Sequence, residues 1–358
     1  MIAFADDNQK QDVMNIWRES FPDDSPQFTE MYFRKKYKKQ NTLLYLIEDK
    51  IASCLQMLPY KMTFYNTVCK TSYISGAATL PEYKNQGIMG KLLTASFSKM
   101  RKRGDDFTTL IPQEPWLIGF YQKYGYTPCF EYNLYLLPIE SSAMNYDYVA
   151  IEMNKSNAKY AFRYYSDYCR KQNLFVQKTY KDFLTIWEDL RLAGGTIVYC
   201  LYSNKVCGIC FYTLKKGKVI LKDLIVDSEI IKRRLTYIAE IRFMSDEIHL
   251  FKQSDDNCNS STLGMARIIN VDTVLEAYAN YYPHLEITLK VSDNQIVENN
   301  GVFQIKEGKC VRSKDDNYDL SVDIAMLTQL VMGFQTDKLP PQYSAFPQQH
   351  PYMSLMLD

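Results

Sequence analysis

Apolar residues recur with helical and strand periods along the first 137 residues, and together these periods predict a mixed fold. Two amphipathic helices come first, followed by three β-rich runs, a long amphipathic helix, a short strand, a short helix and a last strand. The segments that carry this pattern are 7–19 and 27–36 (helices), 42–48, 51–65 and 71–79 (strands), 88–103 (helix), 107–112 (strand) and 115–124 (helix).

The middle of the chain repeats this pattern weakly. Residues 196–227 echo residues 42–80: a strand, a turn at Asn204-Lys205 in place of Asp49-Lys50, a longer strand, a turn and a third strand. A helix with apolar residues at helical spacing follows the repeat. The second segment is therefore predicted to be a second copy of the first.

From Met265 onward the pattern changes again. Alternating strands joined by turns and closed by a helix predict a third, α+β module, and residues 338–358, rich in proline and aromatic residues, are predicted to lie extended over a surface. The predicted fold class is α+β (mixed α/β), with domains at residues 1–137, 138–262 and 263–358.

Composition excludes several classes of protein. The 42 Lys and Arg against 41 Asp and Glu give a formal net charge of +1, which does not suggest a nucleic-acid binder. No apolar run approaches the roughly 20 residues of a membrane span, and the N-terminus lacks the features of a signal peptide, so a cytoplasmic protein is expected.

Cysteine and histidine are placed without the spacing of a metal site. The nine cysteines are scattered apart from Cys207-Gly-Ile-Cys210, and there are only three histidines. Strand alternation predicts that Cys207 and Cys210 point to opposite faces and act as packing residues. No metal is expected.

The link between the third strand and the long helix is the first candidate for ligand chemistry. It reads K-N-Q-G-I-M-G, residues 84–90, with Gly87 at the start of the helix. The first turn of a helix has unpaired backbone N–H groups and a partial positive charge, so Gln86 to Gly90 would suit a phosphate group. The alternative is an ordinary strand-turn-helix link with a glycine in the turn.

This link resembles motif A of the GCN5-related N-acetyltransferases (GNAT), Arg/Gln-x-x-Gly-x-Gly/Ala, which seats the pyrophosphate of coenzyme A. Here it reads Lys84-x-x-Gly87-x-Met89. Lys84 keeps the cation, and Met89 can replace the small residue if its side chain points into the core. In that family the strands on either side of the helix splay apart, and the pantetheine arm lies in the gap.

A second resemblance lies in F-Y-Q-K-Y-G-Y, residues 120–126, which is similar to the family's F-Y-x-x-x-G-F signature. The resemblance implies that Tyr121 is the general acid that protonates the leaving thiolate. The alternative is that Tyr121 packs a helix as one of 29 tyrosines.

An acetyltransferase domain, a degenerate second copy and a sterol carrier protein-like module in this order resemble the enhanced intracellular survival (Eis-like) acetyltransferases over essentially the whole chain. The resemblance implies direct transfer of acetyl from acetyl-coenzyme A (acetyl-CoA) to a primary amine in a ternary complex. The acceptor would be a small molecule, aminoglycoside-like or polyamine-like, or a peptide lysine. The enzyme would be a homo-hexamer without nucleic-acid or membrane partners.

The resemblance also implies, position by position, which residues contact the co-substrate. Backbone groups that would bind the pantetheine arm are those of Ala77, Ala78 and Thr79. The residues that would hold the pyrophosphate are Asn85, Gln86, Gly87, Ile88, Met89 and Gly90, and those that would flank the co-substrate beside Tyr121 are Gln113 and Glu114. The family's arginines next to the glycine are Asn85 and Gln86 here.

Acetylation of an ammonium group needs a general base, and residues 1–137 contain no histidine. In the resembled family the C-terminal carboxylate serves as base, which here would be that of Asp358, in place of the family's usual terminal aromatic. Glu114 is the alternative base. Asp23, Asp24 and Glu30 would either attract a cationic acceptor or form a solvated acidic loop.

The second copy links strand and helix through Val226-Asp227-Ser228-Glu229, which has two acids and no glycine. Such a turn repels a pyrophosphate, so this copy is predicted to bind no co-substrate. The competing hypothesis for the whole chain is a non-catalytic protein that carries an apolar ligand in the third module. Retention of Gly87 and Tyr121 favours the enzyme.

Overall fold

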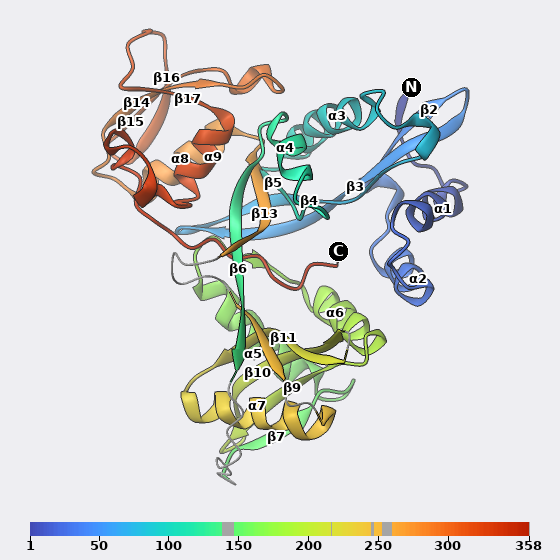
Figure 1. Cartoon of the computed structure of the whole chain (residues 1–358). Helices are drawn as coiled ribbons and strands as arrows, with labels where there is room; N and C mark the ends of the chain where they lie inside the picture. Colours follow the sequence, from blue (N-terminus) through green and yellow to red (C-terminus); the bar gives the residue numbers. More distant parts are fainter. Residues whose placement is uncertain (138–146, 216, 245–246, 253–259, 358) are drawn as a thin grey trace. The chain divides into compact units, whose positions relative to one another are not determined.

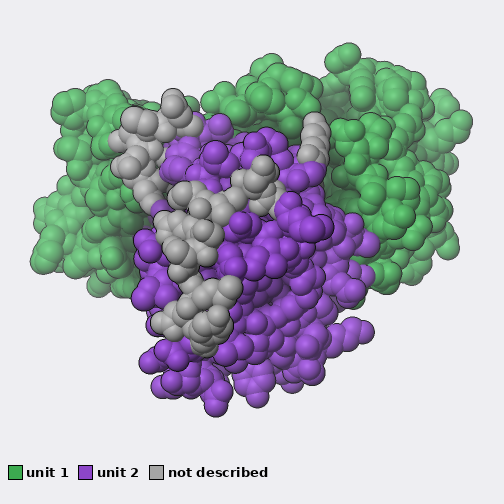
Figure 2. Space-filling view, turned by 60° about the horizontal axis from the view of Figure 1, so that its bottom comes forward, with its two compact units in different colours: residues 1–130, 262–351, 358 green, residues 131–261, 352–357 purple. Residues whose placement is uncertain are grey.

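The computed structural model describes residues 1–137, 147–215, 217–244, 247–252 and 260–357 (Figure 1). The chain forms two compact units, coloured separately in Figure 2. Unit 1 comprises residues 1–130 and 262–351, and unit 2 comprises residues 131–261 and 352–357.

The first part of unit 1 has the predicted order of helices and strands. Its elements are β1 (Ile2–Phe4), α1 (Lys10–Ser20), α2 (Pro26–Lys35), β2 (Thr42–Ile47), β3 (Lys50–Phe64), β4 (Thr67–Thr79), α3 (Ile88–Arg103), β5 (Phe107–Leu110) and α4 (Leu117–Gln122). The strands lie in the order β1-β2-β3-β4-β5-β13, where β13 is Ser261–Ile268. Only β4 and β5 pair in parallel among these neighbours, with α3 as their crossover. Strand β1 was not predicted.

Helix α3 is the element that the sequence pattern predicts most clearly. Its apolar stripe, Leu92, Leu93, Phe97 and Met100, is fully buried in the core of unit 1. The helix ends at Gly104, whose φ of 75° is the left-handed conformation that glycine adopts readily. Three basic residues in the last turn, Arg101 to Arg103, complement the helix dipole.

The last part of unit 1 is a separate four-stranded sheet with two helices. Its elements are α8 (Val271–Tyr281), β14 (Ile287–Ser292), β15 (Gly301–Lys306), β16 (Lys309–Ser313), β17 (Leu320–Asp323) and α9 (Ile324–Val331), with strand order β16-β15-β14-β17. Asp323 caps α9 by accepting a hydrogen bond from the Met326 amide at 2.7 Å. The predicted α+β module is confirmed.

Unit 2 repeats the topology of the first domain. Its elements are the part of β6 (Thr127–Leu137) from residue 131 onward, β7 (Val149–Glu152), α5 (Ala158–Lys171), β8 (Val176–Gln177), α6 (Tyr180–Leu192), β9 (Thr196–Tyr202), β10 (Lys205–Lys215), β11 (Lys218–Val226), α7 (Glu229–Phe243) and β12 (Ile248–Lys252). The series β9-β10-β11-α7-β12 corresponds to β2-β3-β4-α3-β5, including the parallel final pair. The predicted second copy is confirmed.

One prediction for strand β10 was wrong. Cys207 and Cys210 are both buried, as expected of packing residues, but both contribute to the same apolar cluster. The reason is a β-bulge between Val206 and Gly208, which shifts the register and turns Cys207 to the face that Cys210 occupies.

The tail was predicted to be extended from residue 338, but Pro341–Tyr343 form a 3₁₀ turn, and the extended part is residues 352–357, which pack within unit 2. The Tyr352 amide donates to the Leu174 carbonyl at 2.9 Å, and the Ser354 hydroxyl donates to the Asp223 carboxylate at 2.9 Å. Asp223 lies on β11 and is buried, which raises the pKa of its carboxyl to about 6. Asp358, the predicted base, lies outside the described residues.

Asp223→Asn is expected to flatten the dependence of stability on pH. Because the pKa is about 6 in the folded protein against an ordinary 3.8, the unfolded chain loses this proton first as the pH rises. The free energy of unfolding of the wild type should therefore fall by about 2 kcal/mol between pH 4 and 6 relative to the variant. Urea titrations at pH 4, 5, 6 and 7 measure the difference, and parallel profiles would contradict the assignment.

Candidate donor-binding site

Strand β4 loses its partner on one edge just where the site begins. Its parallel pairing with β5 covers Thr71 to Tyr73 and ends at the Tyr73–Thr109 pair, although β4 continues to Thr79. On the other edge, the register with β3 shifts, so Gly76 and Ala77 form a bulge between the paired residues on either side. The last residues of β4 therefore expose backbone groups that no β5 residue bonds.

The bulge at Gly76 and Ala77 packs against the side chain of Trp17. Gly76 has a φ of 57°, and a Cβ at this position would lie 2.3 Å from a ring carbon of Trp17, so only glycine fits. The Trp17 indole N–H in turn donates to the Asp24 carboxylate at 2.7 Å. Burial raises the pKa of Asp24, and the bond from Trp17 offsets part of that rise.

The link from β4 to α3 has the backbone shape expected of an anion site. After the 3₁₀ turn Pro81–Tyr83, Asn85 and Gly87 adopt left-handed φ values of 61° and 72°. Gly87 is the N-cap of α3, where no side chain bonds the first backbone N–H groups, and a Cβ on Gly87 would meet no atom within 4 Å. The start of α3 thus faces open space.

The other residues of the link have separate tasks. Ile88 is buried, and Met89 packs against the core of unit 1, which is the orientation that its place in the motif requires. Gln86 donates its side-chain amide to the Glu82 carbonyl at 3.1 Å, and Lys84 is exposed. Glycine is required at position 90 by packing, because a Cβ there would lie 1.8 Å from the Tyr124 hydroxyl.

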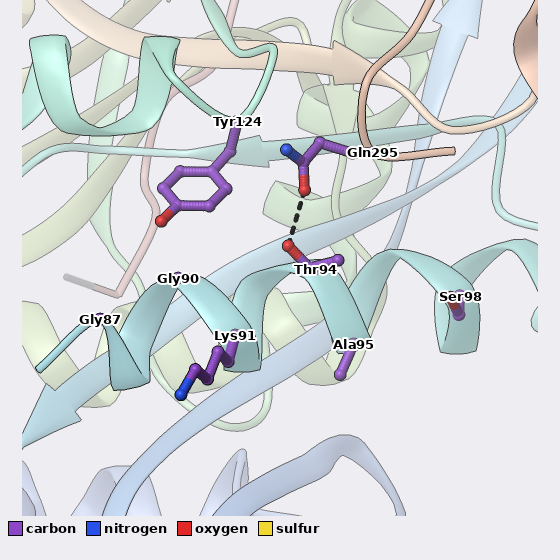
Figure 3. A pocket seen from close by; sticks show the side chains of 8 residues that line it. All are labelled: Gly87, Gly90, Lys91, Thr94, Ala95, Ser98, Tyr124 and Gln295. Atoms are coloured by element: carbon purple, nitrogen blue, oxygen red, sulfur yellow. Dashed lines mark hydrogen bonds between the residues drawn. The ribbon is translucent and has the colours of Figure 1, made fainter. Parts of the chain in front are cut away.

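A cavity of about 480 Å³ follows one face of α3 from its N-terminus (Figure 3). It contains two of the predicted residues, Gly87 and Gly90. The other lining residues were not predicted to contact the donor: Lys91, Thr94, Ala95, Ser98, Tyr124 and Gln295. The helical spacing of positions 87, 90, 91, 94, 95 and 98 would have shown a common face, but nothing in the sequence places Gln295 there.

Tyr121 lies on α4 within the buried core of unit 1. Its ring contacts the rings of Phe120 and Tyr126, with centroids 5.2 and 5.8 Å away. Burial raises the pKa of its hydroxyl to about 12, so the hydroxyl remains protonated at neutral pH and can act as an acid. Gln113 and Glu114 are exposed in the loop between β5 and α4.

Two further findings concern the described residues alone. They contain no cluster of three or more His, Cys, Asp or Glu side chains that would hold a metal ion. Their helices include none with the length and apolar character needed to cross a membrane.

Residues 2–129 match the family model of the acetyltransferase (GNAT) domain, and residues 271–338 match that of the sterol carrier protein domain. The chain therefore carries a GNAT acetyltransferase domain and, in its last third, a sterol carrier protein domain. No curated protein matches the chain in sequence.

Solved structures match the fold over nearly the whole chain. A probable N-acyltransferase from Enterococcus faecalis V583 has a TM-score of 0.80 at 16% identity, covering 98% of this chain and 96% of that one. A GCN5-related N-acetyltransferase from Anabaena variabilis gives 0.78 at 18%, covering 95% and 92%. Eis1 from Mycobacterium abscessus gives 0.76 at 14%, covering 99% of both chains. The Eis-like arrangement predicted from the sequence is confirmed as a fold.

Proposed function

We propose that the protein is an N-acetyltransferase that transfers acetyl from acetyl-CoA to a primary amine, in a ternary complex. The observation that carries this proposal is the open edge of β4 beyond Tyr73 beside the uncapped start of α3. Backbone groups of Ala77, Ala78 and Thr79 would bond the amides of the pantetheine arm, and the first N–H groups of α3 would bind the pyrophosphate. Lys84 would add a cation.

Acetyl-CoA supplies an activated thioester, and side chains of this protein would donate and accept the protons that the transfer requires. Tyr121 is proposed as the general acid that protonates the departing thiolate, because its hydroxyl stays protonated at neutral pH. The base that accepts the proton of the acceptor ammonium is proposed to be the Asp358 carboxylate or Glu114.

The acceptor is proposed to be a cationic amine of a small molecule, aminoglycoside-like or polyamine-like, or a peptide lysine. Among the acidic residues of the α1–α2 region, Glu30 pairs with Arg18 at 3.8 Å. Asp24 instead accepts a hydrogen bond from the indole N–H of Trp17, and the opposite edge of the same indole lies against Gly76 in the β4 bulge. A half-buried carboxylate in that position would attract an ammonium group more strongly than an exposed one.

Asp24→Asn is expected to raise the KM for the amine about tenfold or more and to leave the KM for acetyl-CoA unchanged. Asparagine keeps an oxygen for the Trp17 N–H and removes only the charge. The matched control is Asp23→Asn, because Asp23 is the exposed neighbour. Initial-rate kinetics with both substrates decide the matter, and equal amine KM values in the two variants would contradict the role of Asp24.

A screen of polyamines, aminoglycosides and lysine peptides with acetyl-CoA, read out by release of the free thiol, tests the reaction. Calorimetric titration with coenzyme A tests the site, with one site per chain expected, because the second copy has Asp227 and Glu229 where the first has Gly87. Binding without any acetylation would favour a carrier protein instead. The oligomer proposed with this function is a homo-hexamer, which sedimentation analysis would test.

A further inference from the structure

The cavity along α3 is formed by two domains of unit 1. Most of its lining comes from α3 and Tyr124, but Gln295 belongs to the sterol carrier protein domain and follows β14. The Thr94 hydroxyl donates to the Gln295 side-chain oxygen at 2.6 Å. Figure 3 shows the Gln295 amide nitrogen on the side of Tyr124, away from Thr94. This nitrogen is therefore presented to the cavity as a donor.

The lining offers three kinds of group together. Tyr124 offers an aromatic ring, Lys91 an exposed cation and Gln295 a fixed amide. An aromatic face suits a nucleobase, a cation suits a phosphate, and an amide bonds the edge of a base or a phosphate oxygen. The volume of about 480 Å³ falls in the range of small-molecule sites. The chemistry fits a phosphorylated nucleotide.

One buried ion pair fixes both walls of the cavity. Arg267 on β13 and Asp293 are buried and bond through two contacts of 2.7 and 2.8 Å. Arg267 also donates to the Tyr124 carbonyl at 2.6 Å, and its guanidinium lies over the Phe97 ring. The Asp293 carboxylate accepts from the backbone N–H of Gln295 at 2.8 Å. The same pair therefore positions Tyr124 from the first domain and Gln295 from the third.

We propose that Gln295 contacts the adenosine 3′,5′-bisphosphate end of coenzyme A, so that the sterol carrier protein domain completes the donor site of the acetyltransferase domain. This inference rests on the proposed function, because it assumes that the donor runs from the open edge of β4 past the start of α3. Gln295 would then be a specificity-determining residue for the nucleotide, while the pantetheine arm is bound by β4 of the acetyltransferase domain.

The test uses the full-length protein and two donors. Gln295→Ala should raise the calorimetric Kd of coenzyme A about fivefold to tenfold, the loss expected for one or two hydrogen bonds. Its KM for S-acetylpantetheine, which lacks the nucleotide, should equal that of the wild type, as should kcat. Thr94→Val should also raise the Kd of coenzyme A, because it removes the hydrogen bond that fixes the Gln295 side chain. Gln304→Ala, an exposed glutamine of β15 in the same domain, is the matched control.

The outcomes separate this inference from the proposed function. If the wild type binds coenzyme A and Gln295→Ala binds it equally well, the role of Gln295 is wrong and the acetyltransferase proposal stands. If the wild type binds no coenzyme A, both are wrong. Equal losses with coenzyme A and S-acetylpantetheine would mean that the substitution disturbs the whole site, and that result would also overturn a nucleotide-specific role.

Discussion

Replacing Gly87 with glutamate is expected to abolish measurable binding of coenzyme A. Gly87 caps α3, and a side chain at this position would enter open space, where no protein atom lies within 4 Å. In the proposed complex that space holds the pyrophosphate. A carboxylate a few ångströms from a phosphate costs about 4 kcal/mol at an effective dielectric constant near 20, which corresponds to roughly a thousandfold loss of affinity.

A glutamate at Gly87 also strains the backbone, because φ there is 72°, so a control must share that strain. Gly217 in unit 2 provides it: its φ is 78°, and a Cβ there also meets no atom within 4 Å. Gly217→Glu should lower the melting temperature to a similar extent and leave the calorimetric Kd of coenzyme A unchanged. Normal binding in Gly87→Glu would remove the start of α3 from the donor site.

Periodicity predicted the elements that bury one face. Helix α3 was predicted because Leu92, Phe97 and Met100 recur at helical spacing and meet the sheet, and the β4 and β5 segments because their runs are β-rich. The same reasoning did not identify α5 and α6 of unit 2. Strand β1 was missed because three residues are too short for any pattern.

Parts of the candidate site have no local signal at all. Gln295 lies 201 positions from its partner Thr94, and the domain packing that joins them depends on the buried Arg267–Asp293 pair. A lone arginine in a strand pattern reads as a surface residue, and its burial is decided by a partner far along the chain. The bulge at Cys207 likewise changed a face that strict alternation had assigned.

The residue types in the link between β4 and α3 were more informative, because the proposed phosphate contact depends on the backbone conformation there. Gly87 was placed at the start of the helix from the sequence, and the structure shows it as the N-cap of α3 in the left-handed conformation that glycine adopts readily. Gly90 looked like part of the same anion seat, but its missing side chain makes room for Tyr124. Both glycines line the same cavity. Gly87 leaves space for the proposed phosphate contact, and Gly90 leaves space for Tyr124, which faces the proposed nucleotide.

Tyr121→Phe is expected to lower kcat about a hundredfold or more while the Kd of coenzyme A stays unchanged. The substitution removes one hydroxyl and keeps the ring that packs against Phe120 and Tyr126, so the fold should persist. Since burial raises the pKa of that hydroxyl to about 12, it stays protonated up to at least pH 10. The wild-type rate should therefore show no loss from ionisation of this group across that range.

The matched control for Tyr121 is another hydroxyl of the same aromatic group. Tyr126 is fully buried and its hydroxyl bonds the Thr108 hydroxyl at 3.1 Å, so Tyr126→Phe should cost about 1 kcal/mol of unfolding free energy and leave kcat unchanged. Steady-state kinetics with an accepted amine and urea titrations of both variants give the comparison. If Tyr121→Phe keeps full turnover, the proton comes from another group, and Tyr124 at the cavity becomes the candidate acid.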